Sequence, residues 1–434
     1  MQNVSEKLKQ LLSPVQLDLI QLVSGEATAL GFPLYIVGGL VRDLLLGRPS
    51  IDIDLVVEGE APTLARALVG KYNGKVTIHS RFGTAKWDIR ESKFGNGKFT
   101  TNIDPQFAIP EFLDLASARS ETYKHPASLP RVKLGKIDDD LRRRDFTINT
   151  LAVRLDGSYF GDLRDNYGGV EDLQLGIVRV LHKRSFIDDP TRMYRAIRYE
   201  QRFGFKIEDE TIALIPEALP LIDKLSPQRI RHELDLILEE TKKASILARL
   251  ADLNVLKPIH AALPWDKSVR MRLQVRRYPE LIRGRDDERP TAWLLWLLVL
   301  SKKQIESLDK RLHFTAPLLK ALLAASKLFA DLSPLVDRKP SECVEYLDEL
   351  PLLAVYAVYI ASPDGKSKFV LEKYLKEWRH VRPKITGHDL KRRGLPPGPK
   401  YRKILRDLRN AWLDEEVQDI EAEKRRLEET LRGS

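Results

Sequence analysis

The spacing of apolar and polar residues in the first third of the chain predicts a small sheet with helices packed on it. Residues 15–30 carry apolar side chains at helical spacing, and short apolar or alternating segments typical of strands follow. A further helix is expected around 60–72. The expected strands are 34–37, 51–57, 75–79, 84–90 and 112–117. This succession predicts a mixed α/β unit.

Helical patterns dominate after about residue 160. The last strand-like segment is 177–181, and from residue 184 onward only helices are expected, separated by prolines. The predicted fold class is therefore α+β, with an N-terminal α/β domain followed by an all-helical remainder. Because 434 residues are too many for one core, several domains are expected.

Composition adds an expected location and a class of partner. The single cysteine, Cys343, excludes an internal disulfide framework and a cysteine-based zinc cluster, and it fits a reducing cytoplasm. No apolar run approaches the roughly 18 residues of a membrane span, so no membrane partner is expected. The net charge is +10, and residues 366–410 carry fifteen Lys/Arg against four Asp/Glu, with aromatic residues interleaved. This segment could bind nucleic acid, or it could be a solvated charged surface.

The segment from 35 to 55 combines two features of nucleotide chemistry. Gly38 and Gly39 stand between a strand and a short helix, where free N–H groups and close backbone approach favour phosphate. Asp52 and Asp54 lie two residues apart in an expected strand, so both side chains project from one face. Two adjacent acids repel each other unless a cation lies between them, and a divalent metal is the obvious candidate. Singly, each feature could also be an ordinary turn or a solvated strand edge.

Other charged residues extend this interpretation. Asp114 alternates as a strand residue and could bring a third carboxylate to the pair, although a surface acid on an edge strand fits its spacing equally. In the segment 138–152, Arg144 could clamp a triphosphate, and Asp145 or Asn149 could contact a ribose hydroxyl. A surface cluster of ion pairs is the alternative there.

A third motif lies at 186–199. Asp189 and Arg192 are three residues apart on an expected helix, so both can face one planar ligand. Arg195 and Arg198 continue the spacing of three. Helix capping explains the aspartate well, but three like charges on one side of a helix are costly without an anion to bind.

In this order and combination the motifs identify a family. The chain resembles the class II tRNA nucleotidyltransferases of the CCA-adding and poly(A) polymerase superfamily, over about 34–240 and again at 385–412. The matching segments are GGLVRD at 38–43, DID at 52–54, RRDFTIN at 143–149, DDPTRMYRAIR at 188–198, LSPQRIRHEL at 225–234 and ITGHDLKRRGLPPGPKYRKIL at 385–405.

The resemblance implies a catalytic nucleotidyltransferase head at 1–156, a neck for base selection and RNA binding at 157–240, a helical body at 241–379 and a tRNA-binding tail at 380–434. It implies that Asp52 and Asp54 bind Mg²⁺ and activate the 3′-hydroxyl of a tRNA for attack on CTP or ATP, and we count Asp114 with them as catalytic. The residues expected to bind the nucleotide are Gly38, Gly39, Arg42, Asp43, Arg144, Asp145, Asn149, Asp189, Arg192, Arg195 and Arg198.

Base choice follows from hydrogen-bonding groups. Cytosine and adenine each present an amine beside a ring-nitrogen acceptor, so a carboxylate and a guanidinium can read both while leaving U and G unpaired. Asp189 and Arg192 supply that pair, and the resemblance gives the same assignment. The family commonly has Glu where Asp188 stands, and we expect Asp188 to orient Arg192. Residues 119–136 correspond to the flexible loop that this family links to the switch from C to A addition.

Several alternatives remain open at this point. The enzyme could add CCA, CC alone or A alone, or it could be a poly(A) polymerase, which shares the head and the arginine helix. From a different class, it could be a non-catalytic RNA-binding protein on the same scaffold. The pair His388-Asp389 is interpreted as structural, because no other histidines are spaced to complete a phosphohydrolase metal cluster. Oligomeric state is not indicated.

Overall fold

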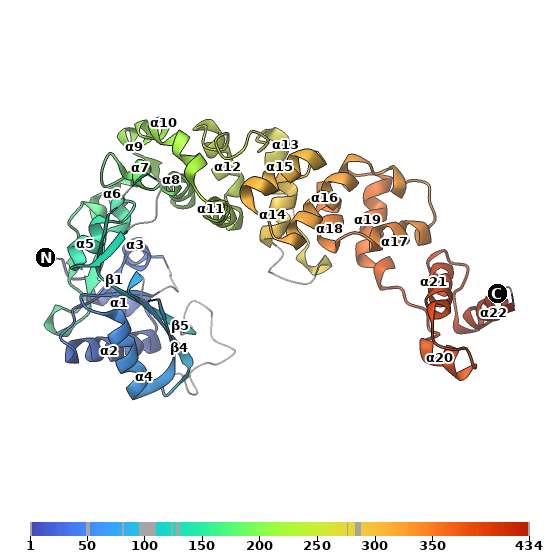
Figure 1. Ribbon diagram of the computed structural model, residues 1–434, viewed down its shortest axis with the longest axis horizontal. Helices are drawn as coiled ribbons and strands as arrows, with labels where there is room; N and C mark the ends of the chain where they lie inside the picture. The colour runs from blue at the N-terminus through green and yellow to red at the C-terminus, as the bar shows by residue number, and fades with distance from the viewer. Residues whose placement is uncertain are drawn as a thin grey trace. The chain divides into compact units, whose positions relative to one another are not determined.

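The computed structural model describes residues 2–48, 53–79, 82–94, 110–122, 125–126, 131–275, 277–282 and 288–432. The chain divides into two compact units, Met1–Leu225 and Ser226–Ser434 (Figure 1). The finer division into head, neck, body and tail stays a prediction; its boundary at 156 lies inside the first unit.

The first unit is built on a mixed sheet of seven strands in the order β3-β4-β5-β2-β1-β8-β9. β2 and β5 are parallel, whereas the other neighbours pair antiparallel. The strands are β1 (Leu34–Val37), β2 (Asp54–Val57), β3 (Asn73–His79), β4 (Thr84–Ser92), β5 (Phe112–Ser117), β8 (Ala152–Arg154) and β9 (Leu163–Arg164). All five expected strands are present, and the one predicted over 51–57 is described from Asp54 onward.

Helices cover both faces of this sheet. α2 (Pro14–Ala29) packs on β1 and on α4 (Ala61–Tyr72), which lies along β3, β4 and β5 (Figure 1). On the other face, α5 (Ile137–Arg142) packs its apolar residues against strand residues that include Val56. Because side chains alternate across a strand, Asp54 projects from the same face as Val56. Asp54 therefore lies on the α5 side of the sheet.

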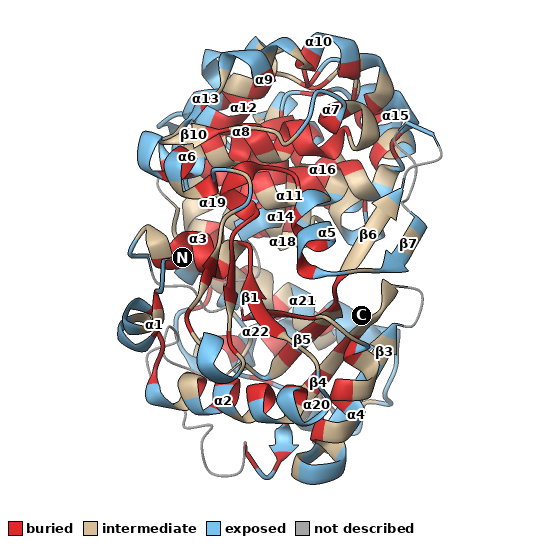
Figure 2. Cartoon of the chain, turned by 90° about the vertical axis from the view of Figure 1, so that its left-hand side faces the viewer, coloured by how far each residue is buried: buried red, intermediate tan, exposed pale blue. Residues whose placement is uncertain are grey.

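The rest of the first unit is mainly helical. Figure 2 shows β1 buried throughout and α8 buried over most of its length. The remaining helices of this unit are α1 (Ser5–Leu11), α3 (Gly39–Leu45), α6 (Gly169–Leu175), α7 (Ser185–Asp188), α8 (Thr191–Phe203), α9 (Asp209–Ala213) and α10 (Ile215–Ala218).

Two short strand pairs differ from the expectation. β10 (Ile177–Val178) lies in the predicted strand-like segment 177–181, but its parallel partner β11 (Lys206–Ile207) lies in a region where only helices are expected. A strand of two residues is too short to show alternation. β6 (Arg119–Thr122) and β7 (Arg131–Leu134) form an antiparallel pair within the segment expected to be a flexible loop.

The second unit is helical throughout its described residues. In its core the rings of Trp293 and Trp296 stack at 5.3 Å, and Phe314 packs edge-on against Trp293 at 5.3 Å. The helices are α11 (Pro227–Glu239), α12 (Lys243–Asp252), α13 (Lys267–Gln274), α14 (Glu288–Leu297), α15 (Lys302–Leu312), α16 (Ala316–Ala330), α17 (Pro340–Asp348), α18 (Leu352–Ala361), α19 (Lys366–Lys376), α20 (Gly387–Arg392), α21 (Pro399–Leu413) and α22 (Ile420–Arg432). The predicted α+β class is confirmed. Among the described residues, no helix has the length and apolar character needed to cross a membrane.

The end of the chain has a small core of its own. Ile385, Leu390, Ile404, Leu408 and Leu427 pack together between α20, α21 and α22. The carboxylate of Glu423, which is fully buried, accepts the backbone N–H groups of residues 384 and 385 at 3.1 Å each. This contact ties the entry to α20 onto α22, so the basic segment is held on a packed helical support.

Candidate active site

Two carboxylates meet where β2 and β5 run side by side. Asp54 and Asp114 are direct partners in the parallel register, so both project from the α5 face of the sheet. Lys86 on β4 is in turn the direct partner of Asp114, and its Nζ lies 3.7 Å from Asp114 Oδ2. Asp52, the other member of the predicted pair, lies outside the described residues. The structure therefore places Asp54 and Asp114 side by side, which is one of the two placements that the sequence left open for Asp114.

These acids line a pocket of about 340 Å³, which we call the carboxylate pocket. Its charged and titratable lining residues are Asp54, His79, Lys86, Asp114, Arg143 and Arg144. The acids form the floor on the sheet, and the two arginines follow α5. A site with acids at its centre and cations at its edge can bind a metal and the phosphates of a nucleotide together.

The donor set fits Mg²⁺. Mg²⁺ usually takes one or two protein carboxylates and completes its shell with water and substrate phosphates. Asp54 and Asp114 supply two carboxylates in register on neighbouring strands. Within the described ranges, no cluster of three or more His, Cys, Asp or Glu that could hold a metal is found. Asp52, the remaining predicted ligand, lies outside these ranges.

Gly38 is required by a close approach as well as by its backbone. It has φ +67° and ψ −119°, a conformation that glycine adopts readily, and it is the N-cap residue of α3. A Cβ on this residue would lie 2.5 Å from Nη1 of Arg144. Nη2 of Arg144 donates to Asp140 at 3.0 Å, which orients the guanidinium. Arg144 Nε is buried and has no hydrogen-bond partner among the described residues, as expected of a donor awaiting a ligand.

Arg42 is buried and its guanidinium is held from several sides. It makes two hydrogen bonds to Asp43, at 2.9 and 3.1 Å, and one of 2.8 Å to Oδ1 of Asn149. The rings of Phe203 and Tyr199 lie 4.5 and 5.4 Å from its Cζ. The arginine therefore joins the turn after β1 to α8 and to the short helical turn Thr147–Asn149.

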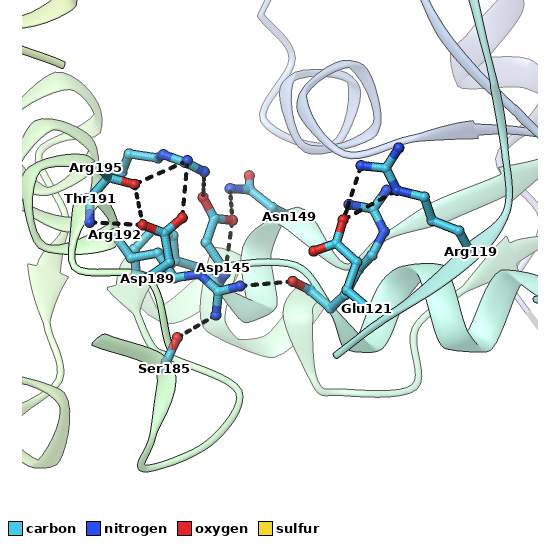
Figure 3. Close-up of polar contacts among 11 residues, drawn as sticks. Arg119, Glu121, Asp145, Asn149, Ser185, Asp189, Thr191, Arg192 and Arg195 are labelled. Carbon is cyan, nitrogen blue, oxygen red and sulfur yellow. Dashed lines mark hydrogen bonds and ion pairs between the residues drawn. The ribbon is translucent and has the colours of Figure 1, made fainter. Parts of the chain in front are cut away.

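The network continues from Asn149 into α8. Nδ2 of Asn149 donates to Asp145 at 2.9 Å, and Arg195 donates to the other oxygen of Asp145 at 3.1 Å (Figure 3). Arg195 also lies 3.8 Å from a carboxylate oxygen of Asp189. Burial alone would raise the pKa of Asp145, but the charge of Arg195, the hydrogen bond from Asn149 and the charge of Arg192 hold its pKa below the ordinary value. Asp145 is thus a buried anion that orients Arg195.

Arg192 is only 4% exposed and is fixed by two hydrogen bonds. Its Nη1 donates to the hydroxyl of Ser185 at 2.7 Å, and its Nη2 donates to the backbone carbonyl of Arg143 at 2.9 Å (Figure 3). Asp189 accepts the backbone N–H of Thr191 at 2.9 Å and its hydroxyl at 2.6 Å. Figure 3 shows Asp189 and Arg192 side by side at the start of α8.

A second pocket, of about 410 Å³, opens beside Arg192 and is called the Arg192 pocket. Arg143 lines both this pocket and the carboxylate pocket. Asp188 and His182 also line it, and burial followed by the charge of Arg192 lowers the pKa of His182. The two pockets are therefore adjacent, and a ligand with a base and phosphates can extend from one into the other.

Arg198, 9% exposed, lies further along α8 with the ring of Tyr199 5.2 Å from its Cζ.

Some residues of the site are not anticipated by sequence reasoning. Glu121 on β6 accepts hydrogen bonds from Arg119 at 2.9 Å and from Arg143 at 3.2 Å (Figure 3). Lys86 and His182 also line the pockets. Of these residues only Arg143 belongs to a motif, and the proximity of the others depends on strand register and on tertiary contacts.

Comparison with known proteins identifies relatives of this chain. A family model described as "Poly A polymerase head domain" matches residues 34–179, and one described as "Probable RNA and SrmB- binding site of polymerase A" matches 204–264. The A-adding tRNA nucleotidyltransferase of Geobacter sulfurreducens is 34% identical over 418 residues, which cover 91% of this chain and 45% of that protein. The A-adding tRNA nucleotidyltransferase of Halalkalibacterium halodurans is 30% identical over 422 residues, covering 93% of this chain and 90% of that protein.

A solved structure shares the fold. The Thermotoga maritima CCA-adding enzyme complexed with tRNA superposes with a TM-score of 0.73 at 29% identity, covering 99% of each chain. The chain thus spans nearly all of this structure and of the Halalkalibacterium relative, but less than half of the Geobacter relative.

Proposed function

The chain belongs to the class II CCA-adding/poly(A) polymerase superfamily of nucleotidyltransferases, and we propose that it extends the 3′ end of tRNA with nucleotides from CTP and ATP. The observation that carries this proposal is the juxtaposition in one pocket of Asp54 and Asp114 with Arg144. Carboxylates for a metal and a guanidinium for phosphates are the parts that nucleotidyl transfer requires.

The chemistry of the step follows from these groups. The 3′-oxygen of the RNA forms a bond to the α-phosphorus, while the bond from that phosphorus to the leaving pyrophosphate breaks. Pyrophosphate departs with the electron pair, and the hydroxyl proton passes to the carboxylate pair. When bound, a divalent metal such as Mg²⁺ lowers the pKa of the attacking hydroxyl and neutralises phosphate charge. Asp54, Asp114 and Asp52 would hold it.

The triphosphate is assigned to Gly38 and Arg144. The missing side chain of Gly38 leaves the guanidinium of Arg144 against the backbone at the start of α3. The buried Nε of Arg144, which has no partner within the described residues, is a donor available to a phosphate oxygen. Gly39 belongs to the same turn. Arg42 and Asp43 act differently in this proposal: their hydrogen bonds hold Asn149 in place.

Base selection is assigned to Asp189 and Arg192 at the start of α8. Both are fixed by the protein, Arg192 by Ser185 and by the Arg143 carbonyl, and Asp189 by Thr191. A fixed carboxylate and guanidinium read the shared pattern of C and A, and leave the protein groups unpaired against U or G. Asp145 and Arg195 hold this end of α8 to the turn that carries Asn149, and Arg198 extends the positive face.

The extent of addition is the finer part of the proposal. Two relatives matched over at least 91% of this chain are A-adding enzymes, whereas the matched structure is a CCA-adding enzyme. We infer addition of the terminal A as the first candidate and of the whole CCA as the second. The tRNA itself is assigned to the basic segment 366–410, which includes α19, α20 and most of α21.

The experiment supplies tRNAs that lack CCA, that end in C or that end in CC, with Mg²⁺ and with labelled CTP or ATP, singly and together. A-only addition predicts incorporation of ATP on tRNA ending in CC, with no use of CTP. Full CCA addition predicts stepwise use of both nucleotides, and CC addition predicts CTP alone. Long A tails on unrelated RNA would identify a poly(A) polymerase, and binding without incorporation would contradict every enzymatic assignment.

A further inference from the structure

A row of charged side chains crosses the sheet at the carboxylate pocket. Lys86 on β4 pairs in register with Asp114 on β5, and Asp114 pairs in register with Asp54 on β2. Arg144 lines the same pocket, beside Gly38 and therefore beside the end of β1, the next strand after β2. Across the sheet the order is therefore cation, acid, acid, cation.

This order distinguishes the two ends of the pocket. In nucleotidyl transfer the attacking oxygen and the leaving group lie roughly in line on opposite sides of the phosphorus. If the leaving pyrophosphate is held by Arg144, as proposed above, the 3′ end of the RNA must approach from the opposite end, where Lys86 lies. We propose that Lys86 binds the last phosphodiester of the incoming RNA strand and so positions its 3′-hydroxyl over the carboxylates. This inference rests on the proposed function.

The setting of Lys86 suits a phosphate contact. Its side chain is 44% exposed, and it lines the pocket rather than the outer surface alone. The ring of Phe112, on the same face of β5 as Asp114, lies 5.0 Å from Nζ. The ring and the aspartate limit where the ammonium can go. An ammonium has three donors, so one contact to Asp114 leaves two for phosphate oxygens.

The alternative is an ordinary surface ion pair. The distance between Lys86 and Asp114 is 3.7 Å, and both side chains are at least 44% exposed. Such pairs typically contribute little to stability. On that view, removing the ammonium would leave RNA binding unchanged.

The test compares two RNA acceptor minihelices ending in CC, one natural and one with an uncharged methylphosphonate at its last phosphodiester. Binding is measured by fluorescence anisotropy at several salt concentrations, without nucleotide. Lys86→Ala should weaken binding of the natural RNA about tenfold, as expected for a charged hydrogen bond, and should lower the salt slope by about 0.7. The methylphosphonate should weaken binding to the wild-type protein similarly, but should have no further effect on Lys86→Ala.

Two control variants make the result specific. Lys75→Ala removes another exposed lysine that pairs with an acid on the same sheet, Glu91 at 3.0 Å, and should bind both RNAs as the wild type does. Lys86→Arg retains the positive charge and should recover most of the affinity. The urea unfolding midpoint of Lys86→Ala should stay close to that of Lys75→Ala, which shows that the protein is still folded.

The outcomes separate this inference from the proposed function. If the wild type incorporates nucleotides but Lys86→Ala binds both RNAs with wild-type affinity, the role of Lys86 is overturned and the function stands. If the methylphosphonate weakens binding equally in both proteins, the phosphate is bound elsewhere and the inference is also overturned. Absence of incorporation by the wild type would refute the proposed function itself.

Discussion

Gly38→Ala tests the arrangement of the triphosphate end of the pocket. The added Cβ would lie 2.5 Å from Nη1 of Arg144, whereas ordinary van der Waals contact begins near 3.4 Å. The guanidinium must therefore move away by about 0.9 Å, the difference between these two distances. Its 3.0 Å hydrogen bond to Asp140 would be strained by that movement.

The expected effect on activity is larger than that on stability. The atom that must move is the end of a flexible side chain, so the unfolding free energy should fall only by the backbone cost, about 1–3 kcal/mol. A misplacement of about 1 Å at a substrate-positioning group can lower the rate about 100-fold. We therefore expect kcat/KM for ATP to fall by about that factor, corresponding to about 2.7 kcal/mol of lost transition-state stabilisation.

A matched control separates the two effects. Gly47 also has a positive φ, +64°, but a Cβ there would meet nothing within 4 Å. Gly47→Ala should therefore lose stability of a similar order, in urea unfolding, without the loss in kcat/KM. The double variant Gly38→Ala/Arg144→Ala should be little worse than Arg144→Ala alone, because the clashing group is gone. A Gly38→Ala enzyme with wild-type kcat/KM for ATP, or additive effects in the double variant, would refute the reasoning.

Three further predictions concern the α8 network and the end of the chain. The pKa of Asp145 lies below its ordinary value of 3.8, so its charged form contributes stability that is present above that pH and lost as the pH falls below it. Asp145→Asn should therefore make the free energy of urea unfolding less dependent on pH between about pH 5 and 2. An unchanged slope would contradict the assignment. Arg192→Ala should relax or abolish the preference for C and A, measured by single-nucleotide incorporation with all four nucleotides; full retention of selectivity would show that the base is read elsewhere. Glu423→Ala should leave the buried N–H of Ile385 without its acceptor, at about 1–3 kcal/mol, and should also remove the acceptor of the more exposed N–H of Lys384. Limited proteolysis near residue 385 should become faster; an unchanged cleavage rate would show that the end of the chain does not depend on this contact.

Local pattern is sufficient to predict part of this site. The alternation that marks 112–117 as a strand places Asp114 on one face, and Gly38 is readable as a turn before a helix. The family resemblance drawn from the ordered motifs is confirmed by the relatives and the matching models. These features succeed because each depends on neighbours within a few residues, where side-chain direction is fixed by secondary structure.

Pairing across long stretches of sequence could not be read in the same way. That Asp54 lies beside Asp114, and Lys86 beside Asp114, depends on strand order and register. The equal spacing of Arg192, Arg195 and Arg198 suggests one shared anion. Instead, the first two have separate protein partners, Ser185 and Asp145, because burial and tertiary contacts decide what each guanidinium meets.

The contacts of Arg42 likewise could not be predicted from its neighbours in the sequence. The family resemblance implies that Arg42 binds the nucleotide, and that role stays a prediction. The structure places it at 5% exposure with hydrogen bonds to Asp43 and Asn149 and aromatic rings beside it. Burial of a charged side chain is governed by partners distant in sequence, and a single sequence does not reveal them.

The central claim is that the carboxylates at the β2–β5 contact are the transfer centre. The most direct measurement is single-turnover incorporation of labelled ATP into tRNA ending in CC, by the wild type and by Asp54→Ala, with tRNA affinity measured on the same samples. Removing this carboxylate should abolish incorporation while tRNA binds with wild-type affinity, because the acid acts on the reacting atoms and not on the RNA as a whole. Incorporation by Asp54→Ala at the wild-type rate would contradict the claim.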